Sequence, residues 1–106
     1  LGWMPSPGEG PSEADMDEGF LKVTLLAHGP GTDGSPKQIR TSLYYPTDPG
    51  YRDTARMLAE SALTMVLDAD HPDVSRAGGV ITPAAAFGGG LLNRLVNTGC
   101  IYQIEE

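Results

Sequence analysis

The strongest pattern in this sequence is an alternation of hydrophobic and polar residues that occurs twice. In residues 20–28 every second side chain, beginning with Leu21 and Val23, is apolar, and the same period returns in residues 37–45. A period of two is typical of a strand with one buried face. The connection 29–36 is rich in glycine and proline. The pattern therefore predicts an antiparallel hairpin with a long tip.

Two helices are predicted after the hairpin, near residues 49–67 and 83–97. Each begins with a polar capping residue and a proline, Asp48-Pro49 and Thr82-Pro83, which is the usual chemistry of a helix start. Gly99 stands where a helix often ends, and residues 100–104 are apolar enough for a closing strand. Apolar residues recur at helical spacing at Ala55, Leu58, Ala62, Met65 and Val66 in the first helix, and at Ala84, Phe87, Leu91, Leu92, Leu95 and Val96 in the second.

These elements predict an α+β fold: a small, mainly antiparallel sheet with strands near 20–28, 37–45 and 100–104, and two helices packed on one face. Residues 1–19 are expected to be an extended, acidic, Pro/Gly-rich linker, with Trp3 and Met4 packed either on this domain or on another part of a longer protein. Residues 20–106 then form a single α+β domain. Val80-Ile81 is either one more short strand or a straight lead-in to the second helix.

The triplet Gly88-Gly89-Gly90 interrupts the second predicted helix. Each glycine disfavours a helix by about 1 kcal/mol relative to alanine, so another feature must offset the cost. Close backbone approach to a neighbouring helix or strand is the favoured cause, and a kink or break at the triplet is the alternative. A phosphate-binding loop is disfavoured, because no strand runs directly into the triplet and no Lys or Ser follows at the required spacing.

The net charge of −7 is unevenly distributed, because residues 1–19 contain five acidic residues and no Lys or Arg. The seven basic residues are scattered along the remainder of the chain. Binding to a nucleic-acid backbone or to an anionic membrane surface requires clustered Lys and Arg. The charge pattern therefore argues against nucleic acid and membrane as partners, and no apolar run is long enough to suggest a membrane span.

The candidate reactive residues are few, and each has an ordinary structural explanation. Cys100 is the only cysteine, so it forms no internal disulfide, and we expect a buried structural thiol in a reducing, cytoplasmic compartment. The acidic residues around His71 lack the spacing of a calcium loop, so no metal site is predicted. His28 has no serine in a strained turn to activate. We therefore assign no catalytic residue.

Three segments, taken in order, resemble the C-terminal part of one enzyme family. They are Pro7-Gly8-Glu9-Gly10-Pro11-Ser12-Glu13; then Asp48-Pro49-Gly50-Tyr51 with Thr54-Ala55 and Met57-Leu58-Ala59-Glu60-Ser61-Ala62; and finally Gly78-Gly79-Val80-Ile81-Thr82-Pro83-Ala84-Ala85-Ala86-Phe87-Gly88 with Leu91-Leu92. Together they resemble the saccharopine-dehydrogenase-like oxidoreductases, a group that includes the trans-acting enoyl reductases. The resemblance covers nearly the whole chain.

The resemblance implies that this chain is the C-terminal segment of a longer NAD(P)-dependent oxidoreductase. The dinucleotide would bind a preceding Rossmann domain, so no cofactor-binding residue is expected here. The segment would shape the substrate side of the cleft and supply dimer contacts, without being catalytic alone. Tyr45, Tyr51 and Thr82 lie at element ends, where clefts form, and are the candidates for pocket or interface contacts. The alternative is a stand-alone, non-enzymatic binding or oligomerisation module.

Overall fold

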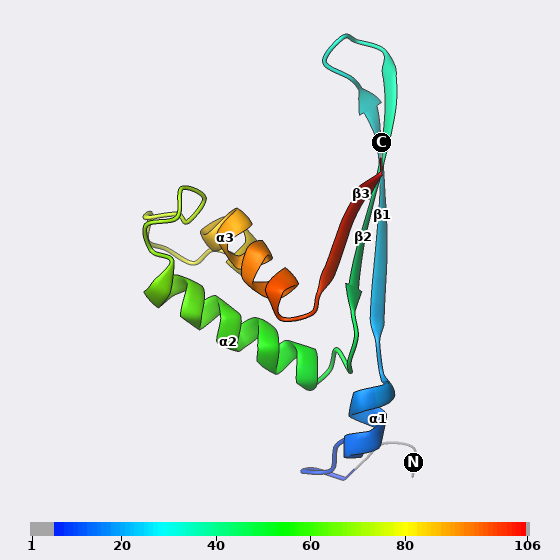
Figure 1. The fold of residues 1–106 in the computed structure, drawn as a ribbon, viewed down its shortest axis with the longest axis vertical. Helices are drawn as coiled ribbons and strands as arrows, with labels where there is room; N and C mark the ends of the chain where they lie inside the picture. Colours follow the sequence, from blue (N-terminus) through cyan, green and yellow to red (C-terminus); the bar gives the residue numbers. More distant parts are fainter. Residues whose placement is uncertain (1–5, 106) are drawn as a thin grey trace.

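The computed structural model describes residues 6–105 and confirms the α+β class (Figure 1). Both long helices lie on the same side of a three-stranded sheet. The chain is elongated, with a Cα radius of gyration of 17.4 Å, whereas a compact domain of this length has about 13 Å. In chain order, the elements are α1 (Glu13–Glu18), β1 (Leu21–Pro30), β2 (Pro36–Tyr45), α2 (Arg52–Leu67), α3 (Pro83–Asn97) and β3 (Ile101–Glu105).

The sheet is antiparallel with the order β1-β2-β3. Leu21 pairs with Tyr45 and Pro30 pairs with Pro36, so the hairpin is longer and its tip shorter than predicted. The tip closes with a hydrogen bond of 2.7 Å from the amide of Gly31 to the carbonyl of Ser35. Since β3 has only five residues, the outer half of the hairpin projects beyond it (Figure 1).

The predicted extended linker is wrong at residues 13–18, where α1 forms. Ser12 begins this helix with a capping box: its hydroxyl accepts from the amide of Asp15, whose carboxylate accepts from the amide of Ser12. The carboxylate of Asp15 also accepts from the hydroxyl of Ser12 at 2.7 Å, and this bond, followed by the one from the Ser12 amide, lowers the pKa of Asp15 below its usual value. Arg52 ties α1 to α2 through an ion pair of 2.9 Å with Asp17. The first five residues of the linker, including Trp3 and Met4, lie outside the described residues.

The two predicted helix starts differ in outcome. Thr82 caps α3 as expected, because its hydroxyl accepts from the amide of Ala85 at 3.3 Å. In contrast, α2 begins at Arg52, three residues later than predicted. The carboxylate of Asp48 accepts from the amide of Tyr51 at 2.6 Å. Asp48 therefore stabilises a turn that precedes the helix and does not cap the helix itself. The lead-in at Val80-Ile81 contains a bend and is not a strand.

At its C-terminal end, α3 stops as the sequence indicates. Gly99 has a φ of +113°, and its amide donates to the carbonyl of Val96 at 3.1 Å. The amide of Cys100 donates to the carbonyl of Leu95 at 3.0 Å. This pair of bonds is the Schellman motif, which needs a residue free of the Cβ restriction. It turns the chain directly into β3.

At the glycine triplet the predicted alternative, a kink, is confirmed, whereas the close neighbour is a loop and not the expected helix or strand. Gly88 has a φ of 45° and a ψ of −129°, which breaks the helical path within α3. The loop before α3 also approaches closely, since a Cβ on Gly88 would stand 3.0 Å from the backbone oxygen of Asp73 and one on Gly90 would stand 3.2 Å from Val74. The carboxylate of Asp73 lies against Gly89. The triplet therefore packs against a loop and does not cradle a phosphate.

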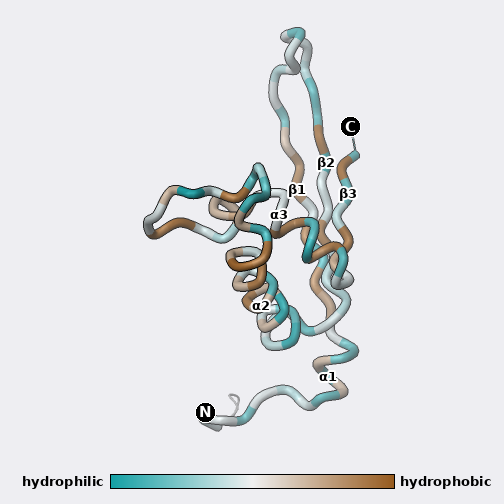
Figure 2. The backbone as a smooth tube through the Cα atoms, turned by 60° about the vertical axis from the view of Figure 1, so that its left-hand side comes forward, coloured by the Kyte–Doolittle hydropathy of each residue, from teal (hydrophilic) through white to brown (hydrophobic). Residues whose placement is uncertain are grey.

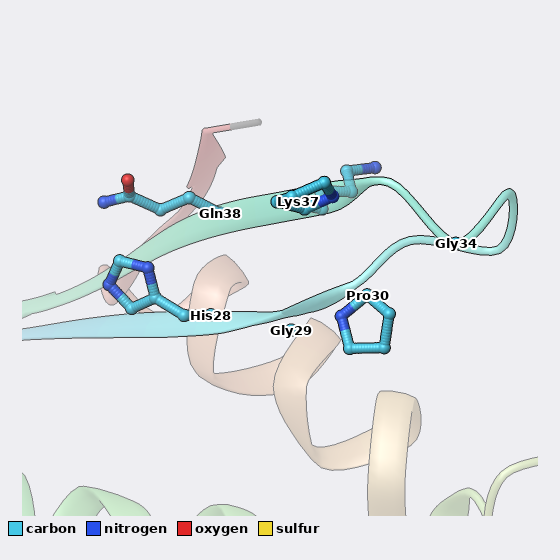
Figure 3. Close-up of a pocket in the computed structure, with 7 residues that line it drawn as sticks. His28, Gly29, Pro30, Gly34, Lys37 and Gln38 are labelled. Carbon is cyan, nitrogen blue, oxygen red and sulfur yellow. The ribbon is translucent and has the colours of Figure 1, made fainter.

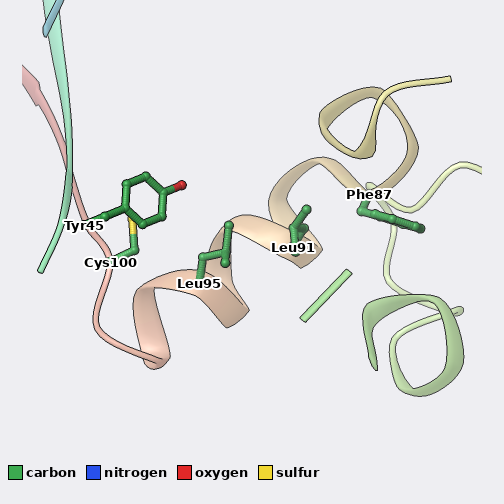
Figure 4. Close-up of a cluster of buried hydrophobic side chains, with 5 residues drawn as sticks. All are labelled: Tyr45, Phe87, Leu91, Leu95 and Cys100. Atoms are coloured by element: carbon green, nitrogen blue, oxygen red, sulfur yellow. The ribbon is translucent and has the colours of Figure 1, made fainter. Parts of the chain in front are cut away.

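A small core joins α3 to the lower end of the sheet (Figure 4). Leu21 and Leu43 line its strand side, and Met57 contributes from α2. Of the predicted apolar stripe of α3, Phe87, Leu91 and Leu95 thus face the interior, whereas Ala84 and Val96 are exposed. Figure 2 shows that hydrophobic residues also continue along α2 and the strands, beyond this core. The buried hydrophobic residues are Tyr45, Phe87, Leu91, Leu95 and Cys100.

In α2, the predicted apolar stripe faces outward and not toward the sheet. Leu58 and Val66, which lie on that stripe, are 72% and 74% exposed. The buried positions of α2 are instead Asp53 and Thr64, both 0% exposed, on the side that meets α3. The helix itself is as predicted, but within the described residues its polar side is the one that packs.

Candidate functional site

A hollow of about 620 Å³ lies at the outer end of the hairpin (Figure 3). His28 and Gln38, which are cross-strand partners, supply its polar side chains together with Lys37. Backbone and proline rings at Gly29, Pro30, Gly34 and Pro36 complete the lining. Because no carboxylate lines this hollow, it holds no carboxylate–imidazole pair for general acid–base chemistry.

A buried polar cluster lies where β2 leads into α2. One oxygen of Asp53 accepts from the amide of Thr47 at 3.1 Å and from its hydroxyl at 2.9 Å. The other oxygen lies 3.1 Å from Nη1 of Arg56 without good hydrogen-bond geometry, so this contact is a charge pairing. Arg56 also donates to the carbonyl of Thr98 at 3.0 Å. The cluster therefore holds the start of α2 to the turn between α3 and β3.

Cys100 and Tyr45 lie beside this cluster, and neither is poised to react. Burial raises the pKa of the Cys100 thiol, and the charge of Asp53 adds to the effect. Burial likewise raises the pKa of Tyr45, with a further contribution from Cys100. A thiol that stays protonated is a poor nucleophile. The expectation of a buried structural thiol is confirmed, since Cys100 is 2% exposed.

A second ionic cluster ties α2 to α3. Nε of Arg94 donates to Glu60 at 2.7 Å and its Nη1 donates to Asp68 at 3.0 Å. The hydrogen bond with Glu60, followed by that with Asp68, raises the pKa of Arg94. Nearby, Asp70 pairs with Arg76 at 2.9 Å. The acidic residues after α2 are thus partly neutralised by arginine, and the described residues contain no group of three metal-ligating side chains.

The structure places the three candidate contact residues in separate surroundings. Tyr45 is buried in the core, where it packs with Cys100. Tyr51 is 56% exposed and lines a shallow hollow with residues 8–11 and Met16. Thr82 is exposed at the start of α3 and is engaged in capping. A substrate or interface role for these residues stays a prediction, which Tyr51 fits best because its ring is accessible.

Sequence reasoning missed Asp53 and Arg94 as organising residues. Both lie among ordinary helical charges, and only tertiary contacts distinguish them. The spacing of Asp53 and Arg56 at three residues was the one available signal, since such pairs face each other on a helix.

Within residues 6–105, none of the helices is both long and apolar enough to cross a membrane. No protein-family model matches the sequence, and no solved structure is significantly similar to it.

Mycobacterial proteins named trans-acting enoyl reductase are 35–37% identical to this chain. The protein of Mycobacterium ulcerans is 35% identical over 99 residues, which is 93% of this chain and 22% of the relative. Those of Mycobacterium bovis and Mycobacterium tuberculosis are each 36% identical over 97 residues, again 22% of their length. Nearly the whole chain is thus similar to a segment of these reductases. That segment makes up about a fifth of each relative's length.

Proposed function

We propose that this chain is the C-terminal, substrate-side segment of a longer NAD(P)-dependent oxidoreductase of the saccharopine-dehydrogenase-like group. The observation that carries the proposal is the coverage of the match, which includes 92–94% of this chain but 22% of each relative. The parent would transfer a hydride to an enoyl substrate as a cytoplasmic homodimer, and this segment would not be catalytic alone.

The sheet supports this proposal because part of its helix-facing side lacks a cover. Leu25, Thr41 and Ile104 are aligned across the three strands, so their side chains share that side. Leu25 and Ile104 are 57% and 56% exposed. Two exposed apolar side chains on either side of Thr41 favour an interaction surface on this part of the sheet. The preceding domain of the parent is the occupant that we propose for it.

The described residues do not fit a dinucleotide. A pyrophosphate site needs a strand, a glycine-rich turn and a helix N-terminus in direct succession. The glycine triplet of α3 is instead filled by the loop at Asp73, whose carboxylate would repel phosphate. Near the other end of the chain, Gly8 and Gly10 flank Glu9, and these residues follow no strand within the described range. The cofactor site therefore belongs, in this proposal, to the preceding domain.

Titration of the 106-residue chain with NADPH, followed by cofactor fluorescence, tests this assignment. We expect no binding, whereas the parent protein binds NADPH and oxidises it in the presence of an enoyl thioester. Micromolar affinity of the chain alone would contradict the placement of the cofactor. The coding region upstream of Leu1 gives a second test, because it should encode a strand, Gly-x-Gly-x-x-Gly and a helix. If it does not, the stand-alone binding module replaces the oxidoreductase segment.

A further inference from the structure

β1 forms one edge of the sheet along its whole length (Figure 1). All ten of its residues pair with β2 in one continuous register, and among the described residues no strand lies on its other side. Every residue from Leu25 to Pro30 is exposed. The outer side of β1 is therefore an open row of backbone donors and acceptors, which is the template that another strand requires.

The backbone amides that point away from β2 can be assigned from the bond that closes the hairpin tip. In an antiparallel ladder, hydrogen-bonded and non-hydrogen-bonded pairs alternate. The amide of Gly31 donates to the carbonyl of Ser35, so this pair is bonded. The next pair, Pro30 with Pro36, is then non-bonded, which suits two residues without an amide hydrogen. Every second amide of β1 before Pro30 therefore points outward. We call these the edge amides, and they belong to Lys22, Thr24, Leu26 and His28.

This edge lacks the features that keep an exposed strand from pairing. Sheets protect a free edge with a short strand, a bulge, a proline or inward-pointing charges. The continuous register of β1 leaves no room for a bulge. From Leu21 to Gly29 the strand contains no proline, no acidic residue and no Lys or Arg except Lys22. Leu25 and Leu26, which lie on opposite faces, are 57% and 58% exposed. An unprotected edge with apolar side chains on both faces is typical of a strand that is paired in the complete protein.

We infer that the edge amides of β1 are hydrogen-bonded by a strand from the part of the parent protein that this chain does not include. The inference rests on the proposed function only in requiring a longer parent, and not on hydride transfer. The match covers 22% of each relative, so most of the polypeptide lies outside it and can supply that strand. Since side chains of neighbouring strands contact each other across a sheet face, the added strand should be apolar opposite both Leu25 and Leu26. A second copy of β1 fits less well, because β1 contains no acidic residue and Lys22 would gain no counter-charge.

Hydrogen exchange of the perdeuterated parent protein, resolved to single amides by NMR, tests the inference. We expect the edge amides to exchange at least about a hundredfold more slowly than in an unfolded peptide. The amides of Val23, Leu25 and Ala27 are the internal control, because they point toward β2 and should be slow whether or not a strand is added. Nuclear Overhauser contacts between the edge amides and amides of residues outside this chain should then identify the added strand.

Edge amides that exchange as fast as in an unfolded peptide, beside slow control amides, overturn the inference. Slow edge amides without contacts to an extended segment outside this chain also overturn it, since another kind of cover then protects them. Contacts between the amides of Thr24 and His28 have the same consequence. These amides are about 13 Å apart within one strand, so such contacts require a second copy of β1. Oxidation of NADPH by the parent is a separate measurement. An active parent with fast edge amides refutes the added strand and not the proposed function, and an inactive parent with paired edge amides does the reverse.

Discussion

Asp53 provides the most direct test of what stabilises this fold. Its side chain is 0% exposed and accepts two hydrogen bonds, both from Thr47, while its second oxygen pairs with Arg56 at 3.1 Å. Asp53→Ala leaves the amide and hydroxyl of Thr47 without an acceptor and Arg56 without its counter-charge. The start of α2 then loses its connection to the end of β2.

The size of the loss follows from these contacts. A hydrogen bond to a charged group contributes about 1.5–3 kcal/mol, and removal of one member of a buried ion pair costs about 3–5 kcal/mol. The contacts share one carboxylate and are not additive, so we expect the free energy of unfolding to fall by about 3–5 kcal/mol. Since small domains have about 5–15 kcal/mol in total, this loss is large. Asp53→Asn keeps the shape and one acceptor and should show an intermediate loss.

Urea unfolding followed by far-UV circular dichroism measures the change, at a protein concentration low enough to keep the chain monomeric. Asp33→Ala is the matched control. Asp33 at the hairpin tip accepts the same kind of pair, from the amide of Ser35 at 3.0 Å and from its hydroxyl at 2.6 Å, but it is exposed. Water replaces those bonds, so the control should lose far less. Equal losses in the two alanine variants would refute the argument that burial makes the Asp53 contacts important.

Three further predictions concern Gly88 and Cys100. Gly88→Ala should destabilise the fold by about 1–3 kcal/mol in the same urea assay, because its φ of 45° and the nearby Asp73 leave no room for a Cβ. Gly78→Ala is the control and should be near neutral, since the space around Gly78 is open. Equal losses of stability in the two variants would show that the break in α3 is unimportant. Cys100 should react with a thiol reagent only as fast as the chain opens, so a rate matching that of a free thiol would contradict its burial. The pKa of Cys100 in the folded chain lies above its ordinary value of 9.0. The stability that this thiol contributes is therefore complete below pH 9.0 and is lost as the pH rises through the folded pKa. Urea titrations at several pH values would detect this loss.

Local signals predicted the elements of this protein well, because each signal involves neighbouring residues. The hydroxyl of Thr82 reaches an amide three residues away, and Gly99 supplies the positive φ that ends α3. Alternation in the two hairpin strands set their register. The short helix α1 was missed because the surrounding prolines and glycines outweighed the capping box at Ser12 and Asp15.

The candidate site was predictable only in part. Cys100 could be recognised as a structural thiol from its apolar surroundings in the sequence. Asp53 and Arg94 could not be recognised as organising residues, since Thr47 lies in the turn before α2, outside the helix of Asp53, and Glu60 lies 34 residues from Arg94. Hydrogen bonds of this kind depend on how the elements meet, which no local pattern contains.

The sequence alone determined that α2 is an amphipathic helix, because the spacing of its apolar residues follows from the geometry of the helix. Only the tertiary structure decided which side of α2 is covered. Within the described residues, the side of Asp53 and Thr64 packs against α3, and the apolar side of Leu58 and Val66 stays exposed. The physical reason is that the periodicity of a helix shows which of its sides is apolar but not which surface covers that side, and no surface among the described residues covers the apolar side of α2.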